Sequence, residues 1–225
     1  MKKARLFLIF SAASLLLFIG LALTVSLVDV APIGPLGSEV GLSSLNGAFS
    51  ELVGYSEVWY QLSEYTIYVA ILTAALFALL GAYQLVKRRS LKLVDANIYL
   101  LGAVYATVIA AYIFFEIFAV NYRPVLTEGE LEASFPSTHT TVVLTIMISA
   151  ACEAWRRIKH SVLRFSVAAT ALLVADFTLI ARLLSGVHWL TDILGGVLFS
   201  AFAVLGYLGV YRILKIKGYI KTAEN

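Results

Sequence analysis

Two of the three histidines in this chain lie in settings suited to nucleophilic or acid–base chemistry. His188 and Asp192 are four residues apart, a spacing that places both side chains on one face of a helix. A carboxylate there accepts a hydrogen bond from one imidazole nitrogen and leaves the other nitrogen free as a nucleophile or base. His160, in contrast, lies in a basic loop, and we interpret it as solvated.

His139 stands directly after a helix-start pattern. Pro136, Ser137 and Thr138 introduce an apolar stretch, and either hydroxyl residue is a natural N-cap. The free amides of a first helical turn bind anions. We therefore predict that His139 lies in the first turn and points toward an anion held at the helix end.

Two arginines complete the group. Arg182 precedes His188 by six residues, and Gly186 between them permits a tight turn that lets both side chains face one pocket. Arg123, followed by a proline, ends another apolar stretch. Two histidines and an aspartate could hold a metal ion, but two guanidinium groups repel a divalent cation and suit a tetrahedral oxyanion. We predict a phosphate site without a metal or other cofactor.

The composition shows what kind of molecule must position these residues. Of the 225 residues, 60% are hydrophobic and only 14% are charged, with a mean hydropathy of +0.89. Soluble domains are about 45–50% apolar and about 25% charged, so this composition indicates an integral membrane protein. The net charge of +3 is too small and scattered for nucleic-acid binding, and the single cysteine, Cys152, excludes an internal disulfide or a CxxC site.

Six apolar stretches predict an all-α, six-helix transmembrane bundle that forms a single domain over residues 1–225. The stretches are approximately Leu6–Val28, Thr66–Val86, Ile98–Val120, Thr140–Trp155, Val162–Leu184 and Ile193–Leu214. The first follows three basic residues but is longer than a signal-peptide core of about 7–15 residues, so we expect a retained helix. The fourth is short.

Basic residues predict the orientation in the cell membrane. Fifteen of the 17 lie in four clusters, which follow zero, two, four and six spans. The clusters are Lys2/Lys3/Arg5, Lys87/Arg88/Arg89/Lys92, Arg156/Arg157/Lys159/Arg164 and Arg212/Lys215/Lys217/Lys221. The positive-inside rule places this side and both termini in the cytoplasm. The two exceptions, Arg123 and Arg182, lie near the outer face and require an anionic partner, so we expect an active site that faces outward.

Several polar or amphipathic features remain open. The outer loop, residues 29–65, has apolar residues at helical spacing and predicts either a helix in the membrane interface or a loop packed over the bundle; these residues are Leu42, Leu45, Phe49 and Leu52. Glu128, Glu130 and Glu132 form either a solvated loop or a gate for the substrate headgroup. Asp176, inside the fifth span, is expected to make an interhelical hydrogen bond.

Together these motifs resemble the type 2 phosphatidic acid phosphatase family, which includes bacterial lipid phosphatases and shares its site with vanadium haloperoxidases. The family pattern is Lys-x6-Arg-Pro, then Pro-Ser-Gly-His, then Ser-Arg-x5-His-x3-Asp. Its matches here are Arg123-Pro124, Pro136-Ser137-Thr138-His139 and Arg182-x5-His188-x3-Asp192. Three positions depart from the pattern: Glu116 replaces the lysine, Thr138 replaces the glycine and Ala181 replaces the serine.

The resemblance implies a role for each matching residue. His188 is implied to form a phosphohistidine, oriented by Asp192, and His139 to protonate the leaving oxygen. The remaining residues are implied to hold the phosphate oxygens; they are Arg123, Ser137, Thr138 and Arg182. The implied function is metal-independent hydrolysis of a lipid phosphomonoester or diphosphate, of the phosphatidic acid, phosphatidylglycerol phosphate or undecaprenyl diphosphate class.

Other functions remain as alternatives. The same site could transfer phosphate to a lipid alcohol, or Glu116 could mark a non-catalytic protein that binds lipid phosphate. A transporter is disfavoured because the polar residues gather at one face rather than at mid-bilayer. The sequence indicates a lipid phosphate and the bilayer as partners, but neither the particular lipid nor the oligomeric state.

Overall fold

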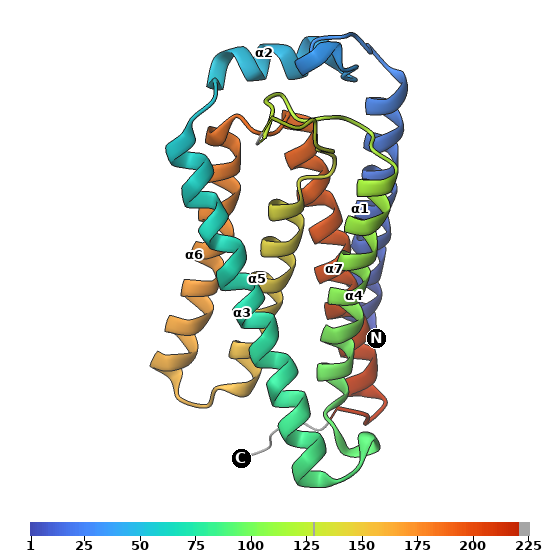
Figure 1. Ribbon diagram of the computed structural model, residues 1–225. Helices are drawn as coiled ribbons and strands as arrows, with labels where there is room; N and C mark the ends of the chain where they lie inside the picture. Colours follow the sequence, from blue (N-terminus) through green and yellow to red (C-terminus); the bar gives the residue numbers. More distant parts are fainter. Residues whose placement is uncertain (128, 221–225) are drawn as a thin grey trace.

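The computed structural model describes residues 1–127 and 129–220, which form seven α-helices (Figure 1). They are α1 (Lys2–Leu27), α2 (Ser43–Val53), α3 (Glu57–Arg88), α4 (Ala96–Ile117), α5 (Thr138–Arg157), α6 (Ser161–Ser185) and α7 (Leu190–Ile216). Helix α2 lies across one end of the bundle, and the other helices run along it (Figure 1). The all-α bundle expected from the sequence is confirmed.

Within the described part of the chain, five helices are long and apolar enough to cross a membrane: α1, α3, α4, α6 and α7. The fourth predicted span corresponds to α5, a helix of 20 residues that does not meet this standard. Hydropathy and length therefore support five of the six predicted spans.

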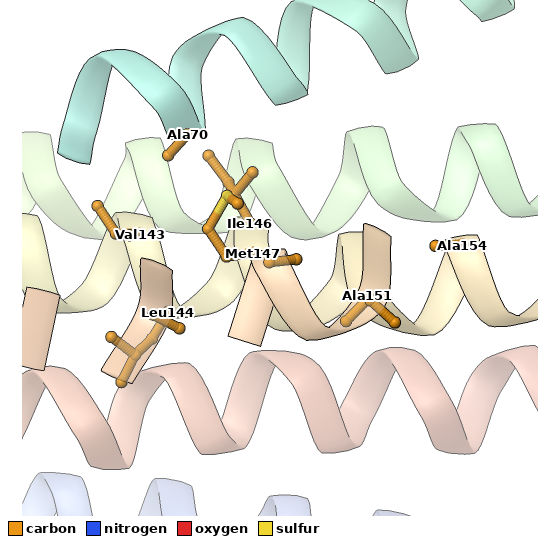
Figure 2. Close-up of a cluster of buried hydrophobic side chains, with 10 residues drawn as sticks. Ala70, Val143, Leu144, Ile146, Met147, Ala151 and Ala154 are labelled. Carbon is orange, nitrogen blue, oxygen red and sulfur yellow. The ribbon is translucent and has the colours of Figure 1, made fainter. Parts of the chain in front are cut away.

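Helix α5 differs from the others because it is surrounded by protein. It contacts α3, α4, α6 and α7, and twelve of its residues are buried. Its apolar side chains, among them Val143, Met147 and Ala151, pack with Ala70 of α3 and with three alanines of α6 (Figure 2). Small residues let helix backbones approach closely. Since α5 faces helices rather than lipid, it can carry hydroxyl and charged residues.

Helix α3 begins well before the predicted start at Thr66. Ser56 is its N-cap, and Glu57 stands in the first turn, where a carboxylate favours the positive end of the helix dipole. The polar residues Gln61, Ser63 and Glu64 precede the apolar run and made this segment look like a loop. All three belong to the helix: Ser63 is buried and Glu64 is half-buried, whereas Gln61 is exposed.

Helix α2 combines features of both expectations for the outer loop. It is a helix that packs over the bundle end, in contact with α6 and α7. Its polar side turns inward: the fully buried Asn46 donates to Thr191 Oγ1 at 3.0 Å. Leu45 and Leu52 are exposed. The helix thus presents apolar residues away from the bundle.

The opposite end gathers the basic clusters. The start of α1 and the ends of α3, α5 and α7 lie there (Figure 1), while Lys221 is outside the described residues. The side chain of Glu153, only 1% exposed, pairs with Arg156 at 2.9 Å and Arg157 at 2.7 Å. It also accepts hydrogen bonds from Asn97 and Tyr207. A buried ion network therefore joins α4, α5 and α7 at this end.

The expectation for Asp176 is wrong. Its side chain is exposed on α6, and no hydrogen bond or salt bridge between described residues joins it to another helix. It lies instead at the edge of an apolar groove of about 740 Å³, which Arg156 and Arg212 also line.

Candidate active site

The N-terminus of α5 lies at the same end of the bundle as α2 (Figure 1), and the helix begins as the sequence predicts. Ser137 is the N-cap, and its side chain accepts from the Thr140 amide at 3.5 Å. The Ser137 amide donates to the Asp192 carbonyl oxygen at 3.0 Å, which ties the start of α5 to the first turn of α7. His139 therefore stands in the first turn of α5, with 12% of its side chain exposed.

The predicted tight turn after Arg182 is also confirmed. Helix α6 ends at Ser185, and its C-cap is Gly186, whose φ of +67° is one that residues with a Cβ rarely adopt. A Cβ on Gly186 would lie 2.0 Å from the Gly54 carbonyl oxygen. The preceding Arg182 side chain is 0% exposed and lies 5.7 Å from the Tyr60 ring centroid. The turn thus buries a guanidinium group at this end of the bundle.

His188 does not lie on a helix, so the prediction of a shared helical face is wrong. Helix α7 begins at Leu190, and Trp189 is its N-cap. The pair still forms, because Asp192 Oδ2 accepts from the Trp189 amide at 2.9 Å and lies 3.5 Å from His188 Nδ1. Capping of α7 therefore holds the carboxylate beside the imidazole.

The surroundings of His188 favour its neutral form. Burial, followed by the positive charges of Arg123 and Arg182, lowers the pKa of His188 well below its ordinary value. The side chain is 3% exposed. A neutral imidazole with one nitrogen facing a carboxylate is suited to nucleophilic attack through Nε2.

Arg123 comes from the loop between α4 and α5. Its Nη2 lies 3.0 Å from Glu132 Oε2, so at least one residue of the acidic loop engages the site; Glu128 lies outside the described residues. The loop is held to α7 by Trp189 Nε1, which donates to the Tyr122 carbonyl oxygen at 2.6 Å. This bond places the arginine over the end of the bundle.

Glu116, at the lysine position of the family pattern, is exposed at the end of α4. With Ser134 and Thr138 it lines a narrow cavity of about 20 Å³ between α4 and the start of α5. Glu132 rather than Glu116 is the ion-pair partner of Arg123. The carboxylate of Glu116 therefore borders the site without neutralising its arginine.

Glu64 is a residue of this site that the sequence reasoning missed. It lies on α3, and its Oε1 accepts from Arg182 Nη2 at 2.6 Å, while Oε2 lies 3.3 Å from His139 Nε2. The signal that could have found it is Ser56 as an N-cap followed by Glu57, which lengthens the second span to include Glu64.

Unpaired polar atoms concentrate here. Among the described residues, 13 buried side-chain nitrogen and oxygen atoms have no hydrogen-bond partner. Seven of these atoms belong to five residues of the predicted site, namely its two histidines, its two arginines and Asp192. They are Arg123 Nε, His139 Nε2, Arg182 Nε and Nη1, His188 Nδ1 and Nε2, and Asp192 Oδ1. His139 Nε2 and His188 Nδ1 each lie beside a carboxylate, at 3.3 Å and 3.5 Å, but without the geometry of a hydrogen bond. Buried donors without partners are rare and call for an explanation.

The chemistry of these atoms fits an oxyanion. Most are nitrogen donors, and the positive charges of both arginines act on both histidines. Within the described residues, no group of three His, Cys, Asp or Glu side chains could hold a metal ion. The arrangement can bind a tetrahedral anion beside a nucleophilic imidazole.

The sequence pattern of the PAP2 superfamily matches residues 92–215, more than half of the chain, and the chain belongs to this superfamily. It is a membrane phosphatase, a phosphoric monoester hydrolase, and a multi-pass membrane protein. The resemblance seen in its motifs is thereby confirmed.

A solved structure is similar over nearly the whole chain. It is the crystal structure of a transmembrane PAP2-type phosphatidylglycerolphosphate phosphatase from Bacillus subtilis, with a TM-score of 0.60 and 22% identity. The match covers 92% of this chain and 97% of that one, so the two share a fold. No curated protein sequence matches significantly.

Proposed function

We propose that this protein removes phosphate from a lipid phosphomonoester or diphosphate at the outer face of the cell membrane. One observation carries the proposal: Arg182 is fully buried, yet two of its guanidinium nitrogens have no partner beside a neutral His188. A buried cation with unpaired donors is costly unless an anion completes it. The name of the similar Bacillus protein supports a lipid phosphate such as phosphatidylglycerol phosphate.

The reaction has two steps. Nε2 of His188 attacks phosphorus, the bond from phosphorus to the lipid oxygen breaks, and His139 gives that oxygen a proton. His139 then takes a proton from a water molecule whose oxygen attacks the phosphohistidine, which releases inorganic phosphate and restores His188. Asp192 stabilises the charge on His188, while Arg123, Arg182, Ser137 and the amide near Thr138 bind the phosphate oxygens.

We further propose six membrane spans, with α5 as the sixth, and both termini in the cytoplasm. Three features support this orientation: the basic clusters gather at one end, the site lies at the other, and α2 presents Leu45 and Leu52 there. A site at this depth would receive a phosphate headgroup while the lipid tail stays in the bilayer.

Phosphate release by the purified protein in detergent tests the proposal. The substrates are phosphatidic acid, phosphatidylglycerol phosphate and undecaprenyl diphosphate, with and without excess chelator. We expect chelator-resistant release and its loss in His188→Ala. His160→Asn, which retains a capping side chain on α6, is the matched histidine control. Equal inactivity of wild type and His188→Ala would refute hydrolysis, and loss of activity with chelator would refute a metal-independent mechanism. Capture of phosphate by added lipid alcohols would identify a phosphotransferase.

A further inference from the structure

Glu64 joins two residues that the proposed reaction uses separately. Its Oε1 accepts from Arg182 Nη2 at 2.6 Å, and its Oε2 lies 3.3 Å from His139 Nε2. The glutamate side chain is 29% exposed, whereas Arg182 is 0% and His139 is 12% exposed. A single carboxylate from α3 therefore bridges α5 and α6 at the edge of the site.

This carboxylate does not fill the anion site. It engages one guanidinium nitrogen of Arg182 and leaves Nε and Nη1 without partners. A phosphate oxygen can therefore bind Arg182 while Glu64 holds the guanidinium in place. Glu64 can orient the Arg182 guanidinium in the same way that, at metal sites, a carboxylate that does not touch the metal orients a metal-binding histidine by a hydrogen bond.

His139 needs such a neighbour if it is to supply a proton. The charged or titratable groups around it are Arg182 from α6, Arg123 from the loop after α4, His188 from the loop before α7, and Glu64 from α3. Glu64 is the only anion in this set. A carboxylate beside an imidazole favours the protonated ring.

We propose that Glu64 is a positioning residue that orients His139 and favours its protonated form for donation to the leaving oxygen. This role rests on the proposed phosphatase reaction. The imidazolium ion of His139 has an N–H on each nitrogen. Its Nε2 lies 3.3 Å from Glu64 Oε2, so the proposal requires the Nδ1 proton to pass to the lipid oxygen as the bond from that oxygen to phosphorus breaks. The neutral ring then accepts a proton from the attacking water. The site thus contains two imidazole–carboxylate pairs, one for each histidine.

The test compares leaving groups. A lipid alkoxide must be protonated as it leaves, whereas the nitrophenolate of p-nitrophenyl phosphate leaves without a proton. Glu64→Gln retains an oxygen for Arg182 but removes the negative charge. The measurement is the rate of phosphohistidine formation in a single turnover, with each substrate. Glu51→Gln, on the exposed side of α2, is the matched control.

We expect Glu64→Gln to slow phosphoryl transfer from the lipid substrate by about 100-fold, in the range of general acid catalysis. The loss with p-nitrophenyl phosphate should be at least ten times smaller, and Glu51→Gln should match wild type with both substrates. Equal losses with both substrates would overturn the proposal and leave Glu64 as a support for Arg182 alone. No loss with either would also overturn it. If wild type forms no phosphohistidine with either substrate, the proposed function itself fails.

Discussion

Burial and two neighbouring guanidinium groups determine the protonation state of His188. Because its pKa is lowered from 6.5, the imidazole stays neutral at pH values where an ordinary histidine is half protonated. We expect phosphohistidine formation to decline only below pH 6.5. In Arg123→Gln the loss of one positive charge raises the His188 pKa, so the acid limb should move to higher pH.

The measurement is the rate of phosphohistidine formation by the variant divided by that of wild type, from pH 4.5 to 8 and with the same substrate. Ionisation of the substrate phosphate affects both rates equally and therefore cancels in this ratio. A ratio that does not change with pH would contradict this assignment. It would mean that Arg123 contributes to binding without acting on the nucleophile.

Arg182 depends on geometry as well as charge. Its planar guanidinium group contacts Glu64 through Nη2 and has two further nitrogens for phosphate. Lysine keeps the charge but cannot make these contacts together. We expect Arg182→Lys to lower kcat/KM by about 100-fold or more, as when one transition-state donor is removed. Thermal unfolding in detergent checks that the variant is folded, and a loss below threefold would show that charge alone suffices.

At the scale of elements, the turn between α6 and α7 controls the distance between Arg182 and His188. Gly186→Ala places a Cβ 2.0 Å from the Gly54 carbonyl oxygen in a left-handed conformation that costs about 1–2 kcal/mol on its own. We expect lower thermal stability and at least a tenfold loss of activity. The control is Gly102→Ala on α4, where a Cβ meets nothing within 4 Å. Full activity in Gly186→Ala would show that the turn tolerates displacement.

The buried ion network supports the other end of α5. Glu153→Gln leaves two arginines with weaker partners, and because these arginines are partly exposed we expect a loss of about 2 kcal/mol in the free energy of unfolding. Glu153 lies 14 residues after His139, about 21 Å along the helix. Activity per folded molecule should therefore stay unchanged. A selective loss of activity would show that the two ends of α5 are coupled.

These elements show what the sequence can and cannot predict. The Ser137 cap and the Gly186 turn were predictable because each depends on a few adjacent residues. The helical face assumed for His188 failed because capping by Asp192 starts α7 two residues later. Glu64 was missed because its partner Arg182 is 118 positions away, and the polar start of α3 hid the helix that carries it. Asp176 remains exposed beside a groove, without the interhelical bond expected from its depth.

For the whole molecule, the proposed orientation can be tested from both sides of the membrane. In a Cys152→Ala background, Glu51→Cys on α2 and Lys159→Cys in the loop before α6 place one exposed thiol at each end. We expect an impermeant maleimide to label Glu51→Cys in intact cells and Lys159→Cys only after lysis. The reverse pattern would place the site in the cytoplasm and contradict outward hydrolysis.

The central position of α5 also has a consequence for synthesis of the chain. A segment enters the bilayer on its own only when it is apolar enough. The other five long helices are apolar enough to cross a membrane by this measure, and α5 is not among them. Its twelve buried residues become favourable only once α3, α6 and α7 surround them. Only three residues separate α5 from α6, so we expect the two to insert together as a hairpin. The helix that carries His139 would then complete its packing only after α7, which follows α6 in the chain, has also entered the membrane.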